Sequence, residues 1–224
     1  SRQSRGLGDV YKRQILSNQD WTFPTNIAYG PGRLKEIGGI CNNLDIKNPD
    51  KGSTKLPFII NLQNYLKSSD VKSDLFFDIS PNPREDDVSN GVSKFKDGNH
   101  DAIIAIGGGS AMDGGKLICL TANNDVPLRD FEFELTPPII SKDNPFPKII
   151  TIPTTAGTGA ETEISAMVTY LKEGMKFCMW HPDVRPSLAL LDPELTIGLP
   201  ANLTAWTGAD AVSYTHLRAH ETVD

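Results

Sequence analysis

Asp101–Lys116 reads DAIIAIGGGSAMDGGK, and this stretch decides the fold of the chain. Its run Ala102–Ile106 is short, wholly apolar and rich in isoleucine, which is typical of a strand buried on both faces. Three glycines follow at once, and the segment that opens at Ser110 continues with apolar residues at helical spacing as far as Leu120. A strand, a glycine turn and a helix start present backbone N–H groups to a phosphate. The stretch therefore predicts a turn that binds a pyrophosphate.

This glycine turn departs from the two commonest phosphate-binding motifs. The dinucleotide fingerprint requires a third glycine where the chain has Met112. The P-loop requires a glycine at Ser110 and a serine or threonine at Leu117. A tight connection between a strand and a helix, with no ligand, is therefore the alternative interpretation. The turn by itself leaves both open.

Strand and helix patterns alternate along the rest of the chain. The strand patterns are an exposed edge strand within Trp21–Gly32, three further strands and a hairpin, over Leu75–Ile79, Lys148–Pro153, Leu188–Leu191, and Ser165–Leu171 with Lys176–Met179. The helix patterns cover Arg33–Leu44, Leu56–Leu66 and Arg84–Phe95. Ile46–Gly52 has a loop composition at the place where an α/β protein would next form a strand. The alternation predicts an α/β fold with a Rossmann-like, mostly parallel sheet and helices on both faces.

A second loop with glycines follows another buried strand. Thr154–Thr162 comes directly after Lys148–Pro153 and combines small hydroxyl residues with two glycines. Ligands of parallel sheets bind beyond the carboxyl ends of the strands, where both glycine loops are expected to lie. Two such loops favour nucleotide binding over a pair of ordinary turns.

Composition narrows the class of protein. The 224 residues are 38% hydrophobic with a formal net charge of −6, which argues against a nucleic-acid or anionic-membrane surface because either needs a basic face. No apolar run approaches the roughly 20 residues that span a bilayer. Three widely spaced cysteines favour a reduced, cytoplasmic environment. We therefore expect a small-molecule ligand, no nucleic acid and no membrane.

Both ends of the sequence differ from the part between them. Residues 1–14 (SRQSRGLGDVYKRQ) are basic without a periodic apolar pattern, and residues 212–224 read VSYTHLRAHETVD. Both resemble translated adapter sequence, with a flexible basic tail and a metal-binding helix as the respective alternatives. We expect a dinucleotide-binding α/β domain over residues 15–200 and the start of a helical metal-binding domain over residues 201–211.

Several motifs occur in an order that resembles one known family. They are Trp21-x-Phe23-Pro24-Thr25, Tyr29-Gly30-x-Gly32, Pro81-Asn82-Pro83, Gly107-Gly108-Gly109-Ser110-x-x-Asp113-x-x-Lys116, Pro153-Thr154-Thr155-x-Gly157-Thr158-Gly159-x-Glu161, Asp192-Pro193-Glu194-Leu195 and Thr207-Gly208-x-Asp210-Ala211. Together they resemble the iron-containing (group III) alcohol dehydrogenase family over about residues 19–211. Each motif alone is weak, and the agreement in order and spacing makes the resemblance specific.

The resemblance implies a dehydroquinate synthase-like N-terminal domain and an all-α C-terminal domain, with Fe²⁺ (Zn²⁺ as the alternative) between them. A small alcohol would bind the metal, which acts as a Lewis acid, and would pass a hydride to NAD or NADP to give an aldehyde or ketone, or the reverse. Family members are commonly homodimers whose N-terminal edge strands pair across the interface, which suits Trp21–Gly30.

The resemblance also implies site residues. Those for the pyrophosphate and the cleft beside it are Gly108, Gly109, Ser110 and Asp113. Those for the phosphates and the nicotinamide ribose are Thr154, Thr155 and Thr158, with Lys176 on the cofactor's ribose. Asp50 would bind the adenosine ribose and favour NAD by repelling a 2′-phosphate, and Asp210 would be the first metal ligand. Without the family, these acids and Lys176 would be interpreted as ordinary surface or helix-start residues and the threonines as turn formers.

The sequence departs from the family in three ways. Asn48-Pro49-Asp50 lacks the apolar run of the family's second strand. Tyr214 stands where the first iron histidine belongs. His216 and His220 are four residues apart and could mimic a metal pair, but His216 is six residues beyond Asp210 and so lies off its helix face. The further helices and histidines that the resemblance implies are not expected among these 224 residues. One carboxylate does not hold iron against water, so we expect the chain as given to lack alcohol dehydrogenase activity. The alternatives are a dehydroquinate-synthase-like or glycerol-dehydrogenase-like NAD and metal enzyme, and a non-catalytic nucleotide-binding module. No catalytic residue is assigned.

Overall fold

The computed structural model describes residues 19–21, 24–51 and 57–218. The predicted tail over residues 1–14 lies outside this range, as do residues 219–224 of the predicted C-terminal tail. In the part that is described, no helix is both long and apolar enough to cross a membrane.

A seven-stranded sheet forms the centre of the molecule. Its strands, in the order β1-β2-β9-β6-β5-β3-β4, are β1 (Gln19–Trp21), β2 (Ile27–Tyr29), β9 (Leu188–Leu191), β6 (Lys148–Pro153), β5 (Ala102–Gly107), β3 (Pro49–Lys51) and β4 (Asp74–Leu75). All neighbouring pairs are parallel except β1 with β2. The predicted mostly parallel sheet is confirmed.

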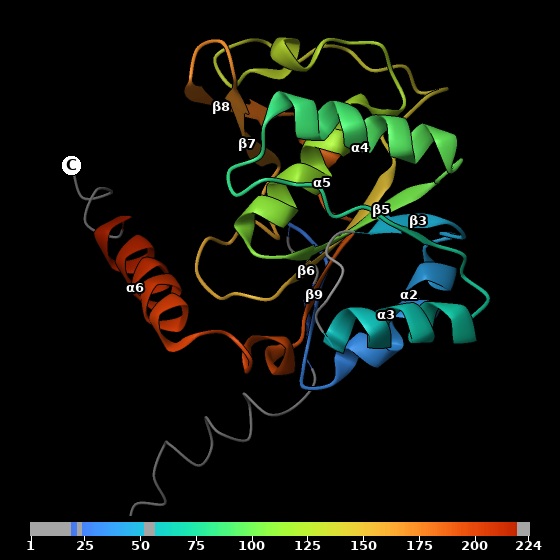
Figure 1. Cartoon of the computed structure of the whole chain (residues 1–224), viewed down its shortest axis with the longest axis vertical. Coiled ribbons are helices and arrows are strands. Elements are labelled where there is room, and N and C mark those ends of the chain that lie inside the picture. The colour runs from blue at the N-terminus through green and yellow to red at the C-terminus, as the bar shows by residue number, and fades with distance from the viewer. Residues whose placement is uncertain (1–18, 22–23, 52–56, 219–224) are drawn as a thin grey trace, which may run out of the picture.

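Helices cover both faces of this sheet. In Figure 1, α2 (Ile37–Asn43) and α3 (Pro57–Ser68) lie below the sheet, and α4 (Glu85–Asp97) and α5 (Gly109–Ala122) lie above it. Alternate residues of β5 supply the two cores, because successive side chains of a strand point to opposite faces. Ile103 and Ala105 pack with α4 and α5, whereas Ile104 and Ile106 pack with α2 and α3. β5 is therefore buried on both faces, as its sequence predicts.

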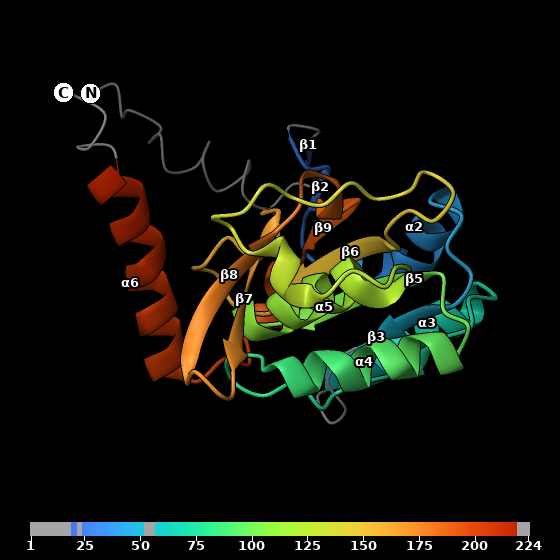
Figure 2. The same ribbon diagram turned by 90° about the horizontal axis from the view of Figure 1, so that it is seen from above.

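Two elements lie outside the sheet. The predicted hairpin forms from β7 (Ser165–Tyr170) and β8 (Met175–Trp180) and packs on α5, with Gly174 at a φ of +63° in its turn. Helix α6 (Ala201–Arg218) stands beyond this hairpin in Figure 2, and most of its described side chains are exposed. α5 is thus enclosed by the sheet, α4 and the hairpin, which explains why it is buried almost all round.

Three local predictions are wrong. The strand within Trp21–Gly32 is β2, which is not an edge strand, because it pairs with β9 on one side and with the preceding strand β1 on the other. Ile46–Gly52 contains a strand despite its loop composition, because β3 is paired on both sides and the Asp101 carboxylate accepts hydrogen bonds from the two amides that precede it. Leu75–Ile79 leaves the sheet after Leu75.

Candidate functional site

The order of the strands places a crevice at the carboxyl end of β5. The chain leaves β3 through α3 toward β4, and it leaves β5 through α5 in the opposite direction, toward β6. This reversal between adjacent strands is the point at which open parallel sheets bind ligands. Both predicted glycine loops follow strands at this edge, because one comes after β5 and the other after β6.

The first glycine loop has the geometry of an anion-binding turn. Gly107 has a φ of +148°, and a β-carbon there would lie 2.7 Å from Ala111 Cβ, so the position requires glycine. The amides of Ala111 and Met112 donate to the Gly108 carbonyl. The amides of Gly109 and Ser110, in the first turn of α5, have no acceptor within the helix. Together with the helix dipole, they fit a phosphate group.

The second glycine loop, Thr154–Thr162, here called the threonine loop, lies against this turn. The Thr154 amide donates to the Gly107 carbonyl at 2.8 Å, which joins the ends of β5 and β6. A β-carbon on Gly108 would lie 3.6 Å from Thr155 Cγ2, and one on Gly109 would lie 3.4 Å from Thr158 Oγ1. The structure therefore brings together the residues predicted for the pyrophosphate and those predicted for the phosphates and the nicotinamide ribose.

Two cavities adjoin the glycine turn and meet at Ser110. The first has a volume of about 390 Å³ and is mainly apolar, with walls from the segment after β4, from β5 and from α5, including Phe77, Ile79 and Pro81. The second, of about 280 Å³, is polar and is lined by Asn82, Gly109, Ser110, Asp113, Thr158, Lys176 and three neighbours. An apolar compartment beside a polar one fits a ligand with a flat apolar ring system at one end and hydroxyl and phosphate groups at the other.

Asn82 connects the polar cavity to the helix start. The backbone N–H of Asn82 donates to Ser110 Oγ at 3.2 Å, and Lys176 Nζ donates to the side-chain Oδ1 of Asn82 at 2.5 Å. Asn82 has a φ of +63°, which asparagine tolerates better than most residues. The sequence motif contained Asn82, but residue types alone did not mark it as a site residue. Its position between two prolines and its left-handed backbone are what place it in the cavity.

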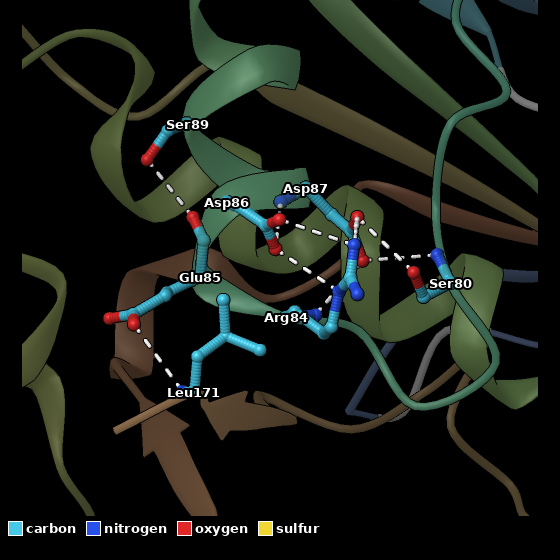
Figure 3. A network of polar contacts seen from close by, with 7 residues as sticks. All are labelled: Ser80, Arg84, Glu85, Asp86, Asp87, Ser89 and Leu171. Atoms are coloured by element: carbon cyan, nitrogen blue, oxygen red, sulfur yellow. Dashed lines mark hydrogen bonds and ion pairs between the residues drawn. The ribbon is translucent and has the colours of Figure 1, made fainter. Parts of the chain in front are cut away.

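A buried carboxylate fixes the turn that carries Asn82. Asp87 Oδ2 accepts hydrogen bonds from the amides of Ser80 and Arg84, each at 3.0 Å, and Oδ1 accepts from Ser80 Oγ at 3.3 Å (Figure 3). Asp87 is 5% exposed, and it is the third residue of α4, where a carboxylate commonly accepts a hydrogen bond from the cap residue's amide. This position after a Pro-Asn-Pro turn was the signal that could have identified Asp87 from sequence.

Asp113 and Lys116 form an ion pair inside the polar cavity's wall. Lys116 Nζ lies 3.7 Å from Asp113 Oδ1. Burial raises the pKa of Asp113, and the Lys116 ammonium opposes that rise. Burial lowers the pKa of Lys116, and the Asp113 carboxylate opposes that change. Each charge stabilises the other, so the Asp113 carboxylate that lines the cavity has its negative charge balanced by the buried Lys116 ammonium.

The two remaining predicted residues, Asp50 and Asp210, lie on β3 and on α6. Asp50 is the middle residue of β3, opposite Ile103 of β5, and its side chain lies outside the described part. Asp210 is an exposed residue of α6. This helix contacts the threonine loop, since a β-carbon on Gly157 would lie 2.7 Å from the Thr207 carbonyl oxygen. Among the described residues, no three His, Cys, Asp or Glu side chains group to hold a metal, so this part of the chain does not fit a complete iron site.

Comparison with known proteins decides the family. A family model described as "Iron-containing alcohol dehydrogenase" matches residues 24–193, which is most of the chain. The chain belongs to the iron-containing alcohol dehydrogenase family. This confirms the resemblance that the sequence motifs carry.

Curated relatives of this family are similar over about half of their own length. A choline dehydrogenase of Bacillus subtilis is 33% identical over 201 residues, which cover 86% of this chain and 48% of the relative. A 1,3-propanediol dehydrogenase of Klebsiella pneumoniae is 31% identical and matches 87% of this chain and 51% of its own. The chain therefore spans about half the length of these alcohol dehydrogenase relatives.

Solved structures of the family share the fold. A 1,3-propanediol oxidoreductase superposes with a TM-score of 0.77 at 29% identity, covering 89% of this chain and 51% of that one. Sulfoacetaldehyde reductase from Bifidobacterium kashiwanohense, solved in complex with NAD⁺, superposes with a TM-score of 0.74 at 30% identity, covering 89% and 52%. The α/β architecture therefore matches one half of the solved family members.

Proposed function

We propose that residues 15–200 form the dinucleotide-binding domain of an NAD(P)-dependent, iron-dependent alcohol dehydrogenase, and that residues 201–211 begin its helical metal-binding domain. The observation that carries this proposal is the pairing of two loops at the carboxyl ends of β5 and β6. One presents the amides of Gly109 and Ser110, and the other brings Thr155 against Gly108 and Thr158 against Gly109. The complex of a relative with NAD⁺ supports the same ligand here.

The positions of the site residues support the following proposed roles. Gly108, Gly109 and Ser110 bind the pyrophosphate, and the apolar cavity receives the adenine. The polar cavity, lined by Thr158, Asp113 and Lys176, holds the nicotinamide ribose. Thr154 and Thr155, from the same loop as Thr158, add hydroxyl partners for the phosphates beside the glycine turn. Asp50, on β3 at the switch point, binds the adenosine ribose and favours NAD over NADP.

The whole protein's reaction requires more than these residues. When bound, the dinucleotide would supply a nicotinamide able to exchange a hydride with the carbinol carbon of a small alcohol. Asp210 is the metal ligand that the family implies, and one exposed carboxylate does not retain ferrous iron. We therefore propose that this chain binds NAD(H) without turning over an alcohol, and that the edge strand β1 is the dimer-forming strand of the whole protein.

Fluorescence titration with NADH, followed by an alcohol assay with NAD⁺ and ferrous iron, tests this proposal. We expect saturable binding and no formation of NADH from alcohol. Failure to bind NADH in a folded sample would contradict the proposed site, and steady NADH formation would contradict the inactivity of the chain. A non-catalytic nucleotide-binding module remains the alternative for the chain taken alone, and binding of ADP with no preference for NADH would favour it.

A further inference from the structure

Lys116 is a fully buried lysine at the centre of the domain. Its exposed fraction is 0%, although its ammonium comes from α5, the helix that carries the phosphate-binding turn. Nζ donates to the carbonyls of Ala160 (2.9 Å), Glu163 (3.5 Å) and Ser165. With Asp113 3.7 Å away, three carbonyl oxygens and a carboxylate surround one ammonium group.

Hydrogen bonds from a buried ammonium group fix the positions of their acceptors more closely than apolar packing does. Burying an ammonium costs free energy unless it is fully hydrogen-bonded, and here all three N–H groups have acceptors. A buried methionine or leucine would fill similar space while accepting several positions of the facing backbone. The lysine instead fixes where the three carbonyls lie relative to α5.

The three carbonyls belong to one segment of the site. Ala160 belongs to the loop Thr154–Thr162, Glu163 follows that loop, and Ser165 is the first residue of β7. The Ala160 amide donates to Thr158 Oγ1 at 3.3 Å, so the residue whose carbonyl binds Lys116 also orients Thr158. Thr158 in turn lies beside Gly109. A chain of contacts therefore runs from Lys116 through Ala160 to the hydroxyl on the polar cavity.

We propose that Lys116 is a positioning residue for the nicotinamide half of the bound dinucleotide, acting by holding the Thr158–Ser165 segment at a fixed distance from the first turn of α5. This inference rests on the proposed function. It predicts an asymmetric effect, since Thr158 lines the polar cavity, whereas no residue of the Thr158–Ser165 segment lines the apolar cavity.

The test compares two ligands and two variants in the full chain. Lys116→Met removes the hydrogen bonds from Nζ to the three carbonyls. Cys119→Ala truncates a buried residue one turn further along α5, whose thiol contacts the Pro147 carbonyl away from the cavity, and it controls for loss of packing in the same helix. Affinities for NADH and for ADP are measured by calorimetry at a temperature where circular dichroism shows each variant folded. ADP reports the adenosine and phosphate part of the site alone.

We expect Lys116→Met to weaken NADH binding at least tenfold and ADP binding less than threefold, and Cys119→Ala to change neither affinity more than threefold. Equal affinity for NADH in Lys116→Met and the parent would overturn the proposal, as would equal losses for both ligands. If Lys116→Met does not fold, Lys116→Gln, which keeps an amide donor, serves instead, and unfolding of both would assign Lys116 to stability rather than positioning. A parent chain that binds ADP but not NADH overturns this inference, and one that binds neither refutes the proposed function itself.

Discussion

Substitution of two adjacent glycines separates the stability of the glycine turn from its proposed ability to bind a phosphate. Gly107→Ala places a side chain at a φ of +148° and a β-carbon 2.7 Å from Ala111 Cβ. The backbone strain costs about 1–3 kcal/mol and the steric overlap about 1–3 kcal/mol. The first turn of α5 relieves part of the overlap by moving. We therefore expect a loss of about 2–5 kcal/mol in the free energy of unfolding, or about 5–15 °C in Tm for a chain of this size.

Gly108→Ala is the matched control. Gly108 has an ordinary φ of −81°, and its β-carbon would meet Thr155 Cγ2 at 3.6 Å, a normal van der Waals distance. Its stability cost should be under about 1 kcal/mol, while the added methyl group stands where the pyrophosphate approaches and weakens NADH binding. Urea unfolding by circular dichroism measures both variants. If Gly107→Ala is within about 0.5 kcal/mol of the parent, or if both variants lose the same stability, the assigned backbone geometry is wrong.

Three further predictions concern buried charges, ionisation and specificity. Asp87→Ala leaves the backbone amides of Ser80 and Arg84 without their carboxylate acceptor and should lower the free energy of unfolding in urea by about 2–4 kcal/mol. Asp86→Ala removes a half-exposed ion pair and should lower it by less than about 1 kcal/mol. Similar losses in the two variants would contradict the role of Asp87. Burial raises the pKa of Tyr170 to about 12. Because the unfolded chain loses this proton first, stability should fall as the pH rises from 10 toward 12, and Tyr170→Phe should reduce that fall in a pH series of unfolding curves; an unchanged slope would show that other groups cause it. Asp50→Ser should lower the ratio of NADH to NADPH affinity in competition titrations, and an unchanged ratio would remove Asp50 from the ribose site.

Elements were predicted well from the sequence where their apolar run is long and both of their faces are buried. β5, α5 and β6 were predicted with nearly their observed bounds, because six-residue isoleucine-rich strands flanked by glycine or proline have few alternatives. β3 could not be predicted, since its three residues carry no apolar pattern and are held in place by the strands on either side. The two glycine loops were correctly placed at one edge because parallel strands end together.

The finer parts of the site depend on contacts between residues far apart in the sequence. Lys116 appears in the sequence as the end of a Gly-Gly-Lys string, and nothing there shows that its ammonium meets carbonyls 44 to 49 residues away. Asp87 and Asn82 stand close together in the chain, yet their roles depend on a turn geometry that residue types do not reveal. Local patterns predicted the elements and the cleft, whereas buried polar partners required the three-dimensional arrangement.

The most direct test of the central claim is an amide chemical-shift titration of the ¹⁵N-labelled chain with NADH. We expect the amide signals of Gly109 and Ser110, at the start of α5, to shift most strongly and to saturate together with those of Thr155 and Thr158. Unchanged signals from the first turn of α5, with shifts confined to other parts of the chain or absent altogether, would contradict it.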